Sequence, residues 1–142
     1  MAATAHIYDQ GMKHILAGEI DWENDSIMLA VLADTYTPDR GADEFWDDVS
    51  EHEAEADDYP AGGVAIDNAA ITVDTDNHIV ALDCDNETLP GPTYPTGHYI
   101  IYYKDTGTPA TSPLIGCVDL DDNITVSGMT INAAGLVTFT LS

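Results

Sequence analysis

The stretch Ser26-Ile27-Met28-Leu29-Ala30-Val31-Leu32-Ala33 is a continuous apolar run with polar residues on both sides. It is short for a helix, and it lacks the alternation of a strand that has one face in water. The pattern is typical of a strand buried on both faces of a sheet. The breaker Thr37-Pro38-Asp39-Arg40-Gly41 follows, so we expect one buried β-strand that ends before it.

Short helices are expected on both sides of this run. Between Ala5 and Ala17 the apolar residues recur at helical spacing, and Gly18 stands where a C-terminal cap is expected. The acidic stretch 42–58 contains Phe45, Trp46 and Val49 at similar spacing. We therefore expect an N-terminal helix and a short helical insertion near residues 43–55, solvated on one face.

Beyond Gly63 the pattern changes to short strands separated by turn residues about every 8–12 positions, the spacing of sandwiches and barrels. The candidate strands are Val64–Val73, His78–Cys84, His98–Lys104, Leu114–Asp119, Ile124–Ile131 and Leu136–Leu141. The segments 74–77 and 133–135 predict tight turns. The proline-rich segments 89–97 and 105–113 predict exposed loops, because proline lacks the donor that a sheet ladder needs.

These patterns predict the fold class. No linker separates two compositions, and no internal repeat is evident. We predict a mainly β single domain over residues 1–142, a β-sandwich or jelly-roll-like arrangement with a short N-terminal helix and a short helical insertion.

The charge balance limits the partners and the surroundings. Asp and Glu number 26 against three Lys and Arg, a formal net charge of −23. Such a field repels nucleic acid and anionic lipid, so we expect neither as a partner. The acids are scattered from Asp9 to Asp122 and lysine is nearly absent. This favours a halophilic setting, because at about 1 M salt the Debye length is only about 3 Å and surface repulsion is screened.

Other sequence signals restrict location and redox state. The first residues show no basic segment followed by an apolar one, and no run approaches the roughly 18 apolar residues of a membrane span. We expect no membrane attachment. Cys84 and Cys117 lie in predicted strands; they either pair across a sheet or serve as small buried hydrophobes.

The sharpest local motif is D-x-D-[ND], which occurs three times. Alternate carboxylates supply hard oxygen ligands for Ca²⁺ or Mg²⁺. None of the three has the glycine and glutamate of a helix-flanked calcium loop, and chance recurrence in an Asp-rich chain is the alternative explanation. The candidate metal ligands are Asp74, Asp76, Asp83, Asp85, Asp119 and Asp121.

No catalytic motif is present in the sequence. The serines lie in no G-x-S-x-G turn, the five histidines are scattered, and the glycines form no phosphate-binding loop. We predict no catalytic residue, no cofactor and a non-enzymatic protein. Aromatic residues serve either as a sugar-binding platform or in packing; they are Trp22, Trp46, Tyr94, Tyr99, Tyr102 and Tyr103.

Three stretches together resemble a family of small tailed-phage virion proteins. The first runs from Gly18-Glu19-Ile20-Asp21-Trp22 through Ile27–Leu32 to Tyr36-Thr37-Pro38-Asp39. The second is Ala61-Gly62-Gly63-Val64 to Val73. The third joins Tyr102-Tyr103-Lys104-Asp105-Thr106-Gly107 with Ser112-Pro113-Leu114-Ile115-Gly116. The resemblance covers most of the chain in the same order and implies a structural role in a virion.

Resemblance and charge together favour a capsid decoration or turret protein on the exterior of a halophilic, archaeal tailed virus. Its expected partners are further copies of itself in a cyclic homo-oligomer and other virion proteins, above all the major capsid protein, with the host surface as a further partner. The alternatives are a tail, neck or fibre-associated protein that helps attachment, a carbohydrate- or Ca-binding β module, and lastly a soluble enzyme. The expected location is the virion, after assembly in a halophilic cytoplasm.

Overall fold

The computed structural model of the protein describes residues 4–85, 87–125 and 137–140. Within these residues the chain forms eight strands, two α-helices and two 3₁₀ turns. In chain order they are β1 (Thr4–Ile7), α1 (Asp9–Leu16), β2 (Ile27–Leu32), α2 (Trp46–Val49), a 3₁₀ turn (Ser50–His52), β3 (Val64–Ala65), β4 (Ala70–Asp74), β5 (Ile79–Asp83), β6 (Thr96–Lys104), a second 3₁₀ turn (Pro109–Thr111), β7 (Leu114–Thr125) and β8 (Val137–Thr140).

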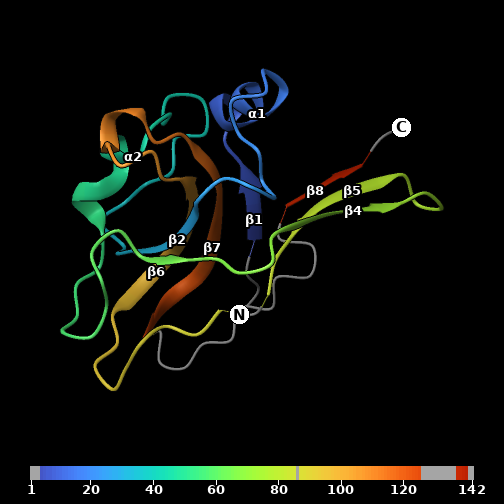
Figure 1. The fold of residues 1–142 in the computed structure, drawn as a ribbon. Coiled ribbons are helices and arrows are strands. Elements are labelled where there is room, and N and C mark those ends of the chain that lie inside the picture. Colours follow the sequence, from blue (N-terminus) through green and yellow to red (C-terminus); the bar gives the residue numbers. More distant parts are fainter. Residues whose placement is uncertain (1–3, 86, 126–136, 141–142) are drawn as a thin grey trace.

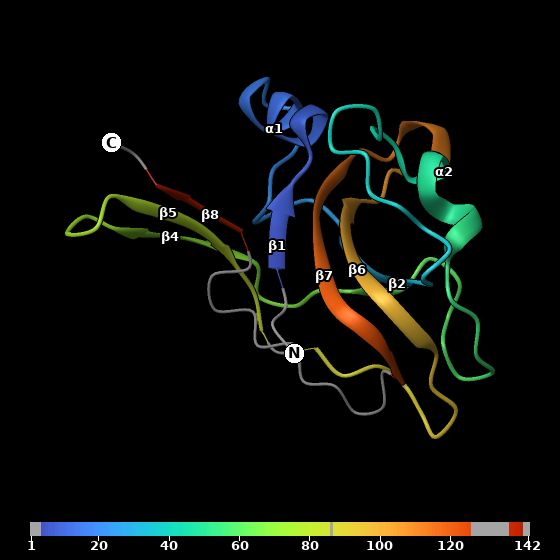
Figure 2. The same ribbon diagram turned by 180° about the vertical axis from the view of Figure 1, so that it is seen from behind.

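The strands form two antiparallel sheets. The larger has the order β1-β7-β6-β2-β3, and the smaller has the order β4-β5-β8. The smaller sheet extends to one side of the larger one (Figure 1), while α1 and α2 lie at the same end of the larger sheet (Figure 2). The prediction of a mainly β protein with a short N-terminal helix and a helical insertion is confirmed, and the arrangement is consistent with one small domain.

The apolar run at 27–32 is central in the larger sheet because both of its faces are buried. Leu29 and Val31 belong to one core cluster, which contains Trp22 and Tyr59, whereas Ala30 and Leu32 belong to a second cluster on the opposite face. Neighbouring β6 alternates between the two clusters in the same way. A strand with no solvent-exposed face has no position that favours a polar residue, which explains why residues 27–32 are all apolar.

The N-terminal prediction is partly wrong. Residues Thr4–Ile7 form a strand that pairs with β7, with Ile7 opposite Gly116, and the helix begins only at Asp9. The exposed edge of β7 offers these residues a full hydrogen-bond ladder, which helical spacing in a single sequence does not reveal. Gly11 lies so close to the Leu114 carbonyl that no side chain fits there, and this contact seats α1 on the end of β7.

Two predicted strand boundaries are also wrong. The predicted strand Val64–Val73 is divided into β3, in the larger sheet, and β4, in the smaller one. Asn68 has φ 51° and turns the chain between them. The predicted strands Leu114–Asp119 and Ile124–Ile131 are joined in β7, in which residues 120–123 bulge opposite the single residue His98. Residues 126–131 lie outside the described residues.

The remaining predictions hold in part. The loop predicted at 105–113 is exposed only as far as residue 111, because Ser112 and Pro113 are buried. The strand predicted at His78–Cys84 is β5, and residues 74–77 turn the chain between β4 and β5. The loop predicted at 89–97 ends at Pro95, because Thr96 and Gly97 belong to β6. Residues 90–93 of this loop are exposed, whereas Leu89 and Pro95 are buried. Of the predicted strand Leu136–Leu141, Val137–Thr140 are described as β8. The turn predicted at 133–135 lies outside the described residues.

The two cysteines are not paired. Both are free thiols, with Cys117 buried in β7 and Cys84 half-buried after β5. Burial raises the pKa of each thiol to about 12, so both are protonated at neutral pH. Among the described residues, no helix has the length and hydropathy needed to cross a bilayer.

Candidate functional site

The first Asp motif closes the β4–β5 hairpin. Oδ1 of Asp74 accepts hydrogen bonds from the backbone N–H groups of Asp76 and Asn77, both at 3.1 Å, and its Oδ2 accepts one from the Asn77 amide at 2.8 Å. These bonds hold the pKa of Asp74 below its ordinary value. The motif is therefore an Asx turn whose carboxylate is already occupied.

The second and third motifs lie elsewhere in the fold. Asp83 ends β5 and accepts a bond from its neighbour's N–H, while Asp85 accepts the Asn68 amide at 2.6 Å. Asp121 lies in the β7 bulge and Asp119 directly before it, and Asp119 accepts the Asp121 N–H at 2.8 Å. The six predicted ligands are thus divided among three places. In the parts of the chain that the structure describes, no group of three His, Cys, Asp or Glu side chains is placed to hold a metal ion.

The β7 bulge gathers polar side chains around His98. Its Nδ1 lies 2.9 Å from Oδ1 of Asn123, and its Nε2 lies 3.3 Å from Oδ1 of Asp119. The Asn123 amide donates to Asp34 at 2.8 Å. These side chains are hydrogen-bond partners of one another, so they stabilise the bulge in β7.

A second polar cluster surrounds the nearly buried His14. The Glu19 carboxylate contacts its Nδ1, and Oε1 of Glu44 lies 2.9 Å from its Nε2. A neutral imidazole carries one N–H, so both carboxylates are hydrogen-bonded only when the ring holds both protons. The carboxylates lie at opposite edges of the ring and do not surround a common point. The cluster ties α1 to the segment before α2.

Sequence analysis did not identify the His14 cluster. Its partners are 5 and 30 residues away along the chain, and Glu44 lies in a stretch where acids are frequent. Local spacing therefore carries no signal for the cluster.

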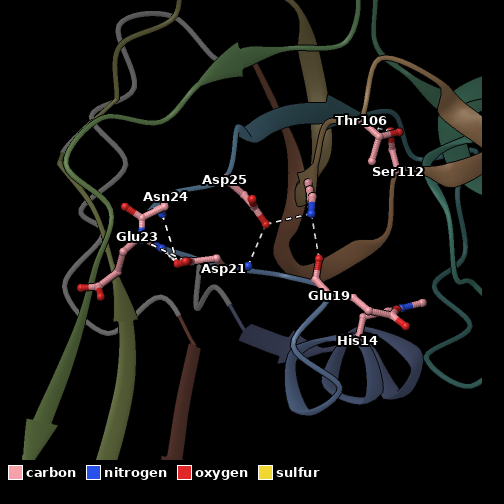
Figure 3. Close-up of polar contacts among 9 residues, drawn as sticks. His14, Glu19, Asp21, Glu23, Asn24, Asp25, Thr106 and Ser112 are labelled. Atoms are coloured by element: carbon pink, nitrogen blue, oxygen red, sulfur yellow. Dashed lines mark hydrogen bonds and ion pairs between the residues drawn. The ribbon is translucent and has the colours of Figure 1, made fainter.

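A pocket of about 240 Å³ adjoins His14, and Lys104 and the hydroxyls of Thr106 and Thr111 also line it. The Lys104 ammonium lies 2.9 Å from the Asp25 carboxylate and 2.7 Å from the Glu19 carbonyl oxygen. Asp25 and Glu19 are labelled in Figure 3, where dashed lines mark these contacts. Thr106 Oγ1 lies 3.1 Å from Ser112 Oγ, which donates to the Thr108 carbonyl. The pocket contains no activated nucleophile, since its hydroxyls bond to one another and to backbone, with no base in contact.

Two buried tyrosine hydroxyls are hydrogen-bonded on the face of the larger sheet that Ala30 and Leu32 cover. The hydroxyl groups of Tyr8 and Tyr36 are 2.7 Å apart, and Tyr36 donates to Asp43 at 2.6 Å. Burial is the main cause that raises the pKa of both phenols, and the Asp43 carboxylate raises that of Tyr36 further. Both phenols stay protonated near neutral pH, so they do not act as bases. Their hydrogen bonds connect β-sheet core residues with the segment that contains Asp43.

Most aromatic residues considered for a sugar platform are buried. Trp22, Trp46, Tyr102 and Tyr103 all belong to the core clusters, and Trp46 stacks on Tyr103 with ring centroids 4.4 Å apart. Their rings are not available to stack on a sugar at the surface.

A mainly apolar groove lies between α1 and the smaller sheet. It has a volume of about 340 Å³. The residues that line it are Ile15, Gly18, Ile20, Asp21, Trp22, Ile71 and Leu82. We call it the α1–β4 groove. It is the candidate functional site, because its surface is apolar and the polar clusters described above are satisfied internally.

Comparison with known proteins does not assign the chain to a family. No family model, no curated protein and no solved structure matches it. The resemblance to tailed-phage virion proteins therefore rests on the sequence stretches quoted above.

Proposed function

We propose that the protein is a non-enzymatic structural component of a virus particle, which decorates the capsid exterior of a halophilic tailed virus. It acts by association with copies of itself and with other virion proteins. The observation that carries the proposal is the α1–β4 groove, an apolar surface in a chain whose net charge is −23. Apolar surface left exposed on a highly charged protein is typical of a contact site.

The polar clusters support an assembly role. The His14, His98 and Tyr8 clusters are each hydrogen-bonded within the protein. Each joins segments that are distant along the chain, and none presents a nucleophile and base aligned for reaction. Their contribution is to the rigidity of the β framework, which suits a protein displayed on a particle.

The acidic surface supports an exterior position. A protein that contacts packaged DNA needs lysine and arginine at that contact, and Lys13, Arg40 and Lys104 are the only bases in the chain. Arg40 donates to the Ile7 carbonyl and Lys104 pairs with Asp25. A hydrated layer of carboxylates is compatible with strong brine outside the cell.

Copy number in purified particles tests the proposal. Quantitative mass spectrometry should find the protein in a fixed ratio to the major capsid protein, at hundreds of copies per particle. A few or tens of copies would favour the tail, neck or fibre alternative, in which the segments 90–97 and 105–113 contact the host through their exposed residues 90–93 and 105–111. Absence from the particle would refute both.

A further inference from the structure

His14 lies at the centre of a contact between α1 and the segment that precedes α2. Its side chain is nearly buried, and each ring nitrogen faces a carboxylate. Glu19 follows α1 and contacts Nδ1, whereas Glu44 precedes α2 and lies 2.9 Å from Nε2. The doubly protonated ring donates to both carboxylates and carries the charge that attracts them. The contact therefore depends on the charge of one side chain.

The lysines of the chain do not take the place of this charge. Lys104 lines the same pocket, but its ammonium lies 2.9 Å from the Asp25 carboxylate. Lys13 precedes His14 and is exposed. Among the described residues, neither carboxylate partner of His14 forms an ion pair with a lysine or an arginine. In this part of the chain the protonated ring is thus the cation that joins the two carboxylates.

The other groups around the ring are uncharged or bonded to backbone. The Phe45 ring packs on the imidazole with centroids 5.7 Å apart. In α2, the Asp48 carboxylate accepts the backbone N–H groups of residues 44 and 45 at 3.0 and 2.9 Å. β7 meets α1 at Gly11 through its backbone. The imidazole and its two carboxylates are therefore the groups whose charge decides the strength of the contact. The remaining residues that line the pocket are the uncharged Thr106, Thr111 and Pro113.

Loss of one ring proton changes this contact. Histidine changes its charge between about pH 5 and pH 8. The nitrogen that loses the proton turns a lone pair toward a carboxylate oxygen, so an acceptor faces an acceptor. The Glu19 side chain is 59% exposed and the Glu44 side chain is 30% exposed, so Glu19 returns to water more easily. The neutral ring then keeps one uncharged donor for Glu44, and the attraction between α1 and the segment before α2 falls.

We infer that His14 is a pH-sensitive clasp, which holds the C-terminal end of α1 on the segment before α2 when its ring is protonated and loosens when the ring is neutral. The start of α1 stays in place, because Gly11 packs against the backbone of β7. The segment before α2 also stays in place, because the Leu114 N–H donates to the Glu44 carbonyl at 2.9 Å. The change is therefore confined to residues 14–19. This inference does not depend on the proposed role in a virus particle.

Hydrogen exchange at the end of α1 tests the clasp. The backbone N–H groups of Ala17, Gly18 and Glu19 donate to carbonyls of this last turn, so their protection reports its opening. Protection factors from NMR, which remove the intrinsic pH dependence of exchange, should fall about tenfold at these amides from about pH 5.5 to about pH 8. The Met12 amide, which donates to the Tyr8 carbonyl at the start of α1, should change much less. Equal protection of the last turn at both pH values would refute the clasp.

Two variants test whether the response belongs to the His14 ring. His14→Gln keeps a side chain that hydrogen-bonds but has no titrating charge, so protection of the last turn should be the same at both pH values. His98→Gln is the matched control, because His98 also contacts a carboxylate but lies opposite the β7 bulge, and it should keep the wild-type response. A response that persists in His14→Gln, or that disappears in His98→Gln, would overturn the inference. Circular dichroism checks that both variants fold, and the wild-type measurement remains a test if either does not.

Discussion

The indole N–H of Trp22 donates a hydrogen bond to the backbone carbonyl of Asp83 at 2.9 Å. Trp22 precedes β2 of the larger sheet, and Asp83 ends β5 of the smaller sheet. The Trp22 side chain is 3% exposed and packs against Tyr102, with ring centroids 6.3 Å apart. This one residue therefore joins the core of the larger sheet to the backbone of the smaller sheet, and it also lines the α1–β4 groove.

Replacement of Trp22 should loosen the smaller sheet. Trp22→Phe keeps most of the ring but leaves the Asp83 carbonyl without its donor, which should cost about 1–3 kcal/mol of unfolding free energy. Trp22→Ala also leaves a cavity and should cost about 3–5 kcal/mol. Urea denaturation followed by circular dichroism measures both values. Equal stability of Trp22→Phe and the wild type would show that the hydrogen bond does not hold the sheets together.

Gly63 is required where β3 approaches β2. Its φ is 87°, and a Cβ at this position would overlap the carbonyl of Leu29. Gly63→Ala should therefore cost about 3 kcal/mol or more. Gly107 is the matched control, because its φ is 85° but nothing lies within 4 Å of an added Cβ. Gly107→Ala should cost only the backbone strain, about 1–2 kcal/mol. Thermal denaturation compares the two, and equal losses would contradict the close approach.

Glu53 should give the stability a measurable pH dependence. Burial raises the pKa of its carboxyl group, although the Gly62 N–H donates to both oxygens at 2.8 and 3.0 Å and opposes the shift. A raised folded-state pKa contributes stability that is fully present below the unfolded-state pKa and is lost as the pH rises through the folded-state pKa. The stability of the wild type relative to Glu53→Gln should therefore fall as the pH rises above about 4, the ordinary pKa range of a Glu carboxyl group.

Denaturant titrations of the wild type and Glu53→Gln at several pH values measure this difference. If the wild type became more stable relative to Glu53→Gln as the pH rose, the result would contradict a raised pKa of Glu53 in the folded state.

Salt should stabilise the folded protein. Self-repulsion at a net charge of −23 is screened as the Debye length falls from about 10 Å at 0.1 M to about 3 Å at 1 M salt. The melting temperature should therefore rise between about 0.1 M and about 1 M NaCl. A triple variant that neutralises exposed acids (Asp47→Asn, Glu55→Gln and Asp57→Asn) should show a smaller rise. A melting temperature that does not respond to salt would remove the basis for the halophilic interpretation.

Sequence patterns predicted the central parts of the fold better than its edges. The run at 27–32 is apolar because both faces of β2 are buried, so its pattern was unambiguous. The strand at Thr4–Ile7 was missed because its partner lies more than a hundred residues away in β7. The bulge opposite His98 interrupts the apolar pattern, and a sequence pattern does not distinguish such a bulge from a turn between two strands.

The candidate site was less accessible to sequence analysis. The Asp motifs were the most recognisable pattern, but several of their carboxylates accept hydrogen bonds from the backbone of their own turn. The exposed residues Ile71 and Val73 looked like ordinary strand residues, because a sequence does not show which strand lies at the margin of a sheet. The groove arises only in the folded chain, where residues of α1 and β4 that are distant in sequence line one pocket.

Location in the particle tests the central claim most directly. A reconstruction of the purified virus, or antibody labelling of intact particles, should place the protein in many symmetric copies on the outside of the shell. Density or label found only on the tail, or none on the particle, would contradict the claim that this acidic β protein decorates a capsid.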